Sequence, residues 1–234
     1  MTITELPLTA ALAPVTHDLY RDIHKAIRVE LFSVTTTAAS LDPSEPEARA
    51  ALAGHVEDIA ALLVEHAEHE DGAIQPVLER ELPGLAAQVE SDHASLQCRI
   101  ASLRDEAADA ARPAIGDPGF AVHRLHLDLA AFTSKYLAHQ DLEERVIMPA
   151  LEESVGVQAV VGIHQAIVGS IPPDAMARSL AIMLPAMNID GRAELLGGMQ
   201  AGAPAEVFDG VWGLAGSVLA PEDRVALARR LDLP

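Results

Sequence analysis

Residues 125–153 read LHLDLAAFTSKYLAHQDLEERVIMPALEE, and the spacing within this stretch decides the fold class. Its apolar side chains, together with one histidine and one glutamate, recur at steps of three or four residues, which is the period of an α-helix. Residues 46–82 repeat the pattern. The two series are Leu125, Leu129, Phe132, Tyr136, His139 and Glu143, and Leu52, Val56, Ile59, Leu63, His66 and Glu70. Both stretches therefore predict long amphipathic helices.

Breaks that contain proline divide the first two thirds of the chain into four such stretches. The predicted helical stretches are residues 15–40, 46–82, 84–111 and 118–153. Aromatic residues make up only 3% of the chain, and alanine and leucine dominate it, which favours helix over strand. The sequence thus predicts an all-α protein with an up-down-up-down four-helix bundle.

The pattern changes after residue 153, where the helical pieces become short and are separated by proline and glycine. We therefore expect two parts, a bundle of residues 1–153 and a C-terminal region of short helices, residues 154–234. The second part contains four of the six methionines and the only tryptophan. We interpret its apolar faces as core. The alternative is a surface that binds a second copy of the chain, as a homo-oligomer, or a protein partner.

Charge and composition exclude several classes of protein. The formal net charge of −19 argues against binding to nucleic acid or to an anionic membrane, because both need clustered lysine and arginine. No segment offers 18 uninterrupted apolar residues, and the N-terminus lacks the basic residues of a signal peptide. A single cysteine excludes a disulfide framework. These features predict a cytoplasmic protein.

Four histidines lie at matching positions in the four predicted helices. His24 is near the start of the first helix and His93 near the start of the third, whereas His66 and His139 are near the ends of the second and fourth. Successive helices run in opposite directions, so all four positions fall at the same end of the bundle. The topology therefore predicts that four imidazoles converge on one layer of the core.

A carboxylate follows two of these histidines by four residues. Glu70 lies one helical turn after His66, and Glu143 one turn after His139. Burial of two carboxylates and four imidazoles without a cation would cost several kcal/mol per group. We therefore predict a two-metal centre in which both glutamates bridge the ions. Mixed nitrogen and oxygen ligands with open positions favour iron and then manganese over zinc, which prefers fewer ligands and more sulfur.

The residues around these ligands resemble the hemerythrin-like (HHE cation-binding) proteins. The matching stretches are IHKAIRVELF around His24, EHAEHEDGAIQPVLE around His66, VESDHASL around His93 and YLAHQDLEERVIMPALEE around His139. The resemblance covers about residues 15–152. It implies a four-helix bundle around two oxo- or hydroxo-bridged iron ions. It further implies that the centre engages O2, NO, peroxide or related small ligands, as a carrier, sensor, repair protein or iron-regulated switch.

One position departs from the oxygen-carrying members of the family, which supply a second histidine four residues after the ligand of the third helix. This chain has Gln97 there. The loss of a nitrogen ligand leaves a further coordination position for water. This favours sensing, peroxide chemistry or NO chemistry over reversible O2 carriage. The main alternative is thus a di-iron enzyme that decomposes peroxide or reduces NO. A helical interaction protein is the second alternative.

A ferritin-like site is disfavoured because it needs two Glu-x-x-His motifs. Only Glu90-Ser-Asp-His93 has that spacing here. Three further residues lie close in sequence to the predicted ligands. Tyr20 and Tyr136 each lie about one turn from a predicted ligand and are candidates to line the site. His17, seven residues before His24, is expected to face solvent or to cap the helix.

Overall fold

The computed structural model describes residues 12–112 and 116–233, and within these ranges the chain forms helices and no strands. The prediction of an all-α fold is confirmed. The N-terminal segment judged unlike a signal peptide lies largely outside the described residues, as does part of the break predicted after residue 112.

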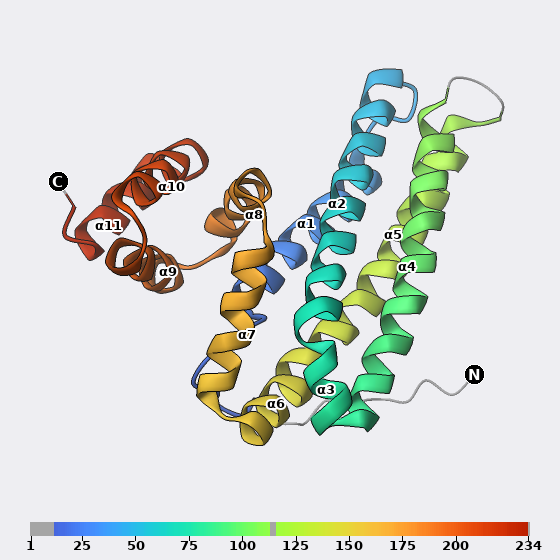
Figure 1. Ribbon diagram of the computed structural model, residues 1–234. Helices are drawn as coiled ribbons and strands as arrows, with labels where there is room; N and C mark the ends of the chain where they lie inside the picture. Colours follow the sequence, from blue (N-terminus) through green and yellow to red (C-terminus); the bar gives the residue numbers. More distant parts are fainter. Residues whose placement is uncertain (1–11, 113–115, 234) are drawn as a thin grey trace. The chain divides into compact units, whose positions relative to one another are not determined.

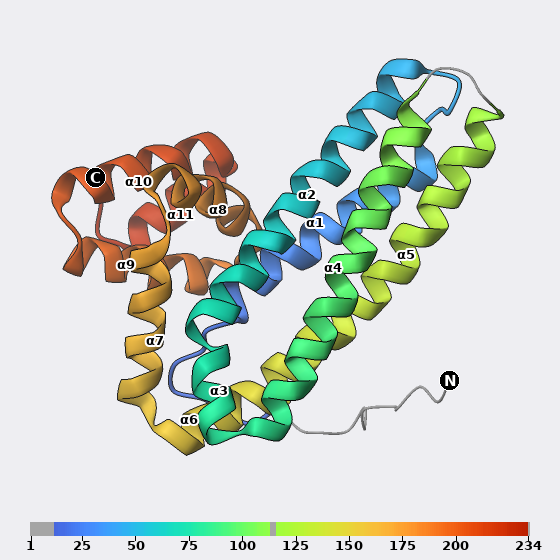
Figure 2. The same cartoon turned by 45° about the vertical axis from the view of Figure 1, so that its right-hand side comes forward.

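Four long helices make up the bundle (Figures 1 and 2). They are α1 (Arg21–Ser40), α2 (Pro46–Ala73), α4 (Pro83–Ala111) and α5 (Pro118–Leu142). Apolar side chains from all four surround a common gap of only about 20 Å³, so the interior is closely packed. Among them are Leu31 and Val34 of α1, Leu63 of α2, Leu103 of α4 and Phe132 of α5.

Proline sets three of the four helix starts. Pro46, Pro83 and Pro118 occupy the first turns of α2, α4 and α5, where the missing N–H is not needed by the helix. The side chain of Asp117 also accepts a hydrogen bond from the Gly119 N–H at 2.9 Å and caps α5. No such proline precedes α1. It begins at Arg21, later than the predicted residue 15.

Two of the predicted helices are interrupted near their ends. After α2 comes a short helix, α3 (Gln75–Glu81), and after α5 come a π-helical turn, η1 (Glu143–Ile147), and α6 (Met148–Val155). A proline lies at the second position of both α3 and α6, Pro76 and Pro149. Proline cannot donate a hydrogen bond to the carbonyl four residues earlier, so the regular ladder fails just before it.

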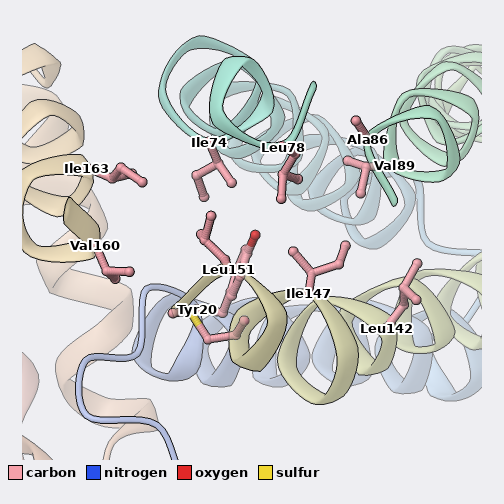
Figure 3. Close-up of a cluster of buried hydrophobic side chains, with 11 residues drawn as sticks. Tyr20, Ile74, Leu78, Ala86, Val89, Leu142, Ile147, Leu151, Val160 and Ile163 are labelled. Atoms are coloured by element: carbon pink, nitrogen blue, oxygen red, sulfur yellow. The ribbon is translucent and has the colours of Figure 1, made fainter. Parts of the chain in front are cut away.

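A compact apolar cluster holds these broken segments together. Figure 3 shows Ile74 and Leu78 facing Ile147 and Leu151, with Val160 of α7 (Val157–Ser170) beside them. Ile147 and Leu151 are completely buried. Burial of each such side chain contributes about 1.5–3 kcal/mol relative to exposure. The cluster therefore fixes the helix ends that follow the glutamates of both His-x-x-x-Glu motifs.

The chain divides into two compact units. The first contains residues 1–20 and 27–167, and the second contains residues 21–26 and 168–234. The division after residue 167 lies later than the expected change at residue 153, because α7 packs on the cluster just described. The boundary drawn from the sequence at 153 remains a prediction.

The second unit has a core of its own. Its remaining helices are α8 (Pro173–Ala186), α9 (Ile189–Gly202), α10 (Ala205–Val218) and α11 (Pro221–Arg230). Leu184, Leu196 and Leu227 are fully buried in its core. The buried Arg192 donates to the Leu184 carbonyl at 2.7 Å and pairs with Asp223 at 2.9 Å, which links α8, α9 and α11.

Among the described residues, no single helix is long and apolar enough to cross a bilayer. One bent pair, residues 118–155 with 157–170 at an angle of 115°, meets that test of length and composition only when taken together.

Candidate metal centre

The six predicted ligands come from the four long helices and from η1, and all six are buried. His24 is on α1, His66 and Glu70 are on α2, His93 is on α4, His139 is on α5, and Glu143 is the first residue of η1. Because α2 and α5 run opposite to α1 and α4, the start of one helix meets the end of the next. The structure thus brings these side chains to one layer of the bundle, and their role as metal ligands stays a prediction.

The ligand atoms form two groups that share Glu70. The first group is His24, His66 and Glu70, and the second is Glu70, His93, His139 and Glu143. Within each group the ligand atoms lie within 4.8 Å of one another, which is close enough for one ion to contact them all. Glu143 occurs in the second group only. The two groups are thus adjacent and have one carboxylate in common.

The two oxygens of Glu70 face different histidines. Oε1 lies 3.1 Å from Nε2 of His66, and Oε2 lies 3.3 Å from Nε2 of His93. A carboxylate that gives one oxygen to each of two ions needs this divergence. The sequence predicts bridging for both glutamates. Glu70 occurs in both ligand groups and Glu143 in one, and bridging itself stays a prediction for each of them.

Glu143 lies between two imidazoles of the second group. Its Oε1 is 3.2 Å from Nε2 of His139 and 3.9 Å from Nε2 of His93. The two rings meet edge to face with their centroids 5.0 Å apart. Both histidines thus direct Nε2, rather than Nδ1, toward the same carboxylate oxygen.

Two aspartates face the opposite nitrogens of these rings, and one of them, Asp71, makes a hydrogen bond. Nδ1 of His93 makes a 2.8 Å hydrogen bond with Asp71, and Nδ1 of His139 lies 3.8 Å from Asp92. A carboxylate on one ring nitrogen favours a proton there and leaves the other nitrogen as a metal ligand. Sequence reasoning missed both aspartates. Their only indication in the sequence is that each lies next to a predicted ligand, Glu70 or His93.

The electrostatics of the layer favour positive charge. Burial opposes charge on His139, but the nearby carboxylates of Glu143 and Asp92 raise its pKa to about 10. Burial likewise opposes charge on His66 and His93, and the carboxylate of Glu70 raises the pKa of both. The glutamates therefore create a negative potential that stabilises a cation, whether it is a proton on imidazole or a metal ion.

A small hollow adjoins the second ligand group. It has a volume of about 10 Å³, close to the minimum for one water molecule. His93, His139, Tyr136 and Gln97 line it together with Leu63, Ala67, Leu96 and Ile100. Gln97 therefore faces the space beside the two histidines. This is the position at which, from the resemblance noted in the sequence, oxygen carriers have an additional histidine.

Both tyrosines predicted to line the site are buried close to it. The ring of Tyr136 lies 5.8 Å from that of His139, centroid to centroid. Burial raises the pKa of the Tyr136 phenol, and Glu70 and Glu143 raise it further. The pKa of Tyr20 is raised by burial and by the same two glutamates. Both phenols thus stay protonated.

His17 differs from its prediction. Its ring is half-buried rather than facing solvent, and Nε2 lies 2.6 Å from Nδ1 of His164 on α7. Its backbone N–H donates to Glu152 of α6 at 2.9 Å. His17 thus helps to hold the segment before α1 against α6 and α7, and it belongs to neither ligand group.

The residues present fit a pair of metal ions, because four imidazoles and two carboxylates supply the mixed nitrogen and oxygen donors that iron, manganese and zinc accept. In comparisons with known proteins, the family model described as the hemerythrin HHE cation-binding domain matches residues 15–151. Comparison with curated proteins and with solved structures found no match. The matched range contains all six candidate ligands together with Asp71 and Asp92.

Proposed function

Because this chain belongs to the hemerythrin HHE cation-binding domain family, we propose that its bundle is a non-haem di-iron module that binds or senses O2, NO or related small ligands, or handles iron. A bound iron pair would supply reversible redox chemistry and open positions for a small ligand. Metal binding follows from the family and from the buried histidine and glutamate cluster. The identity of the metal and of the ligand is the proposed part.

The observation that carries the proposal is the sharing of Glu70 by two ligand groups. A site for a single ion would need only one of the groups. The four imidazoles and two carboxylates of this layer also lie on packed helices or directly at a helix end, so the donors are held in place before an ion arrives.

The hollow beside His93 and His139 supports a ligand of very few atoms. At about 10 Å³ it excludes organic substrates but admits a water-sized molecule. Apolar side chains such as Leu96 and Ile100 form part of its wall, which suits a neutral diatomic molecule. The amide of Gln97 and the phenol of Tyr136 can donate hydrogen bonds to an atom held there.

Metal content tests the first half of the proposal. Protein expressed with added iron and purified without chelator should hold close to two irons per chain and show near-ultraviolet charge-transfer absorption. His66→Ala should lose both properties. His69→Ala is the matched control, because His69 lies on the same helix but in neither ligand group. Less than one iron in the wild type, or unchanged iron in His66→Ala, would contradict the proposal.

Rapid mixing tests the second half. The reduced protein is mixed anaerobically with O2, NO or peroxide, and its absorption is followed. A stoichiometric adduct that forms and decays reversibly supports binding or sensing. Continuous loss of peroxide or NO over many turnovers would instead assign the enzymatic alternative. If none of the three changes the spectrum, the proposed ligand class is wrong even with two irons bound.

A further inference from the structure

The gap that the four long helices enclose is lined by apolar side chains only, and we call it the central cavity. All ten of these side chains are buried, and they come from α1, α2, α4 and α5. Its volume of about 20 Å³ exceeds the roughly 10–15 Å³ that one water-sized molecule needs. The central cavity therefore has room for one small molecule.

The chemistry of the central cavity selects a neutral and apolar occupant. A buried water molecule needs about two to four polar partners, which the side chains of leucine, isoleucine, valine, alanine and phenylalanine do not supply. An ion would lose its hydration there without any compensation. A neutral diatomic molecule such as O2 or NO has little hydration to lose, and it gains dispersion contacts with the wall. The central cavity thus favours a dissolved gas over water, ions and polar substrates.

Two side chains separate the central cavity from the small hollow beside the metal centre. Leu63 of α2 and Ile100 of α4 line both spaces. The small hollow is lined in turn by His93 and His139 of the second ligand group. A molecule in the central cavity is therefore one layer of side chains away from the space beside these candidate ligands.

Alanines on one face of α2 leave room at both levels. Ala60 lines the central cavity and Ala67 lines the small hollow, with Leu63 between them. Seven residues make about two helical turns, so the two alanines lie on the same face about 10 Å apart. Leu96 and Ile100 continue the apolar wall on α4, which runs in the opposite direction. The apolar lining is thus continuous from the middle of the bundle to the centre.

We propose that the central cavity is a docking site for a neutral diatomic gas, and that the gas passes from it between Leu63 and Ile100 to the metal centre. A helix holds isoleucine to one χ1 rotamer, so Leu63 is the side chain that moves to open the passage. The apolar route admits O2 and NO and excludes polar molecules such as peroxide. The docking site rests on the cavity alone, whereas delivery to the centre rests on the proposed di-iron function.

Dissolved O2 itself tests the docking site, because its unpaired electrons speed the relaxation of nearby nuclei. The relaxation of methyl NMR signals is measured under O2 and under N2 pressure, with the centre filled by diamagnetic Zn2+. Methyl groups of Leu63, Leu103 and Leu129 should relax several times faster under O2. Those of Leu184 and Leu227, which are buried in the core of the second unit, are the internal control and should change little. Equal enhancement in both sets, or none in either, would overturn the docking site.

A variant that fills the cavity tests delivery. Ala60 is 4% exposed and lines the central cavity but not the small hollow. Ala60→Val adds two methyl groups there and should slow the association of O2 and of NO with the reduced iron protein about tenfold in rapid mixing, which equals about 1.4 kcal/mol in the barrier. The iron content should be unchanged, because Ala60 is not a candidate ligand. The rate with hydrogen peroxide should also be unchanged, because peroxide is too polar for the cavity.

Ala107→Val is the matched control, because it makes the same change at a buried alanine of α4 that is not among the lining residues. It should leave all three rates unchanged. Delivery through the cavity is refuted if both variants slow O2 equally, if Ala60→Val slows neither gas, or if it slows peroxide as much as O2. If the wild type holds iron but reacts with neither gas, the proposed function and the delivery step both fail. The relaxation measurement needs neither iron nor a variant, so it still decides the docking site.

Discussion

The shared position of Glu70 predicts that the two glutamates of the centre have different effects when they are replaced. Glu70 belongs to both ligand groups and Glu143 to only one. Glu70→Gln keeps the size of the side chain but removes the charge that both ions would share. Glu143→Gln makes the same chemical change at one ion only. We therefore expect Glu70→Gln to lose both irons and Glu143→Gln to retain one.

The expected magnitude follows from the burial of these carboxylates. Glu70 is 5% exposed and Glu143 is 1% exposed. Removal of one partner from a buried charge pair costs about 3–5 kcal/mol. Since about 1.4 kcal/mol corresponds to a factor of ten in affinity, Glu70→Gln should weaken both ions by a factor of about 10²–10³ or more. Glu143→Gln should weaken the ion bound by His93 and His139 to the same extent and leave the other unchanged.

The assay is iron content after dialysis against a graded series of a competing chelator, together with electron paramagnetic resonance of the oxidised protein. A coupled ferric pair is silent, whereas a lone ferric ion gives a signal. Glu143→Gln should show one iron and that signal. Glu68→Gln, an exposed position on the same helix as Glu70, is the control and should keep two irons. If Glu143→Gln loses both irons as readily as Glu70→Gln, both glutamates bridge the ions and the predicted difference between them is refuted.

Three further predictions concern the rest of the first unit. Leu151→Ala should lower the free energy of unfolding by about 2–5 kcal/mol in urea titration, because Leu151 is fully buried, and an unchanged midpoint would contradict its place in the cluster. The pKa of His164 is lowered by burial and by His17, so the unfolded chain takes up its proton first. Stability should therefore fall as the pH drops below about 6.5, and less steeply in His164→Gln. Gln97→His should lengthen the lifetime of an O2 adduct about tenfold in rapid mixing, because an added nitrogen ligand displaces water; an unchanged lifetime would argue against a role for Gln97.

The meeting of the six candidate ligands in one layer could be predicted because two simple regularities determine where they lie. Proline marks the helix starts at 46, 83 and 118, and alternating directions place His24, His66, His93 and His139 at one end. The spacing of four residues then puts each glutamate on the face of its histidine. The all-α fold and the family follow from the same residues. None of this required knowledge of side-chain contacts.

The contacts around the ligands could not be predicted because they depend on how far each helix is rotated about its axis. Asp71 and Asp92 lie directly beside candidate ligands in the sequence, but so do Glu65 and His69. Neighbouring residues point in directions that differ by about 100° around a helix. Only the packed structure shows that the two aspartates turn toward Nδ1 of His93 and His139. The contact of His17 with His164 joins residues far apart in sequence and has no local indication.

The π-helical turn at Glu143 explains how one helix face serves both the centre and the cluster behind it. In an α-helix, a step of four residues advances 400°, so a series with that spacing drifts about 40° around the helix at each step. His139, Glu143, Ile147 and Leu151 form such a series, yet all four are buried. The wider turn over Glu143–Ile147 rotates less per residue and offsets this drift. The proline at 149, which prevents a regular hydrogen bond to residue 145, favours the wide turn. Pro149 thus favours a turn that keeps Glu143 in the layer of candidate ligands while Ile147 and Leu151 anchor the same face in the core.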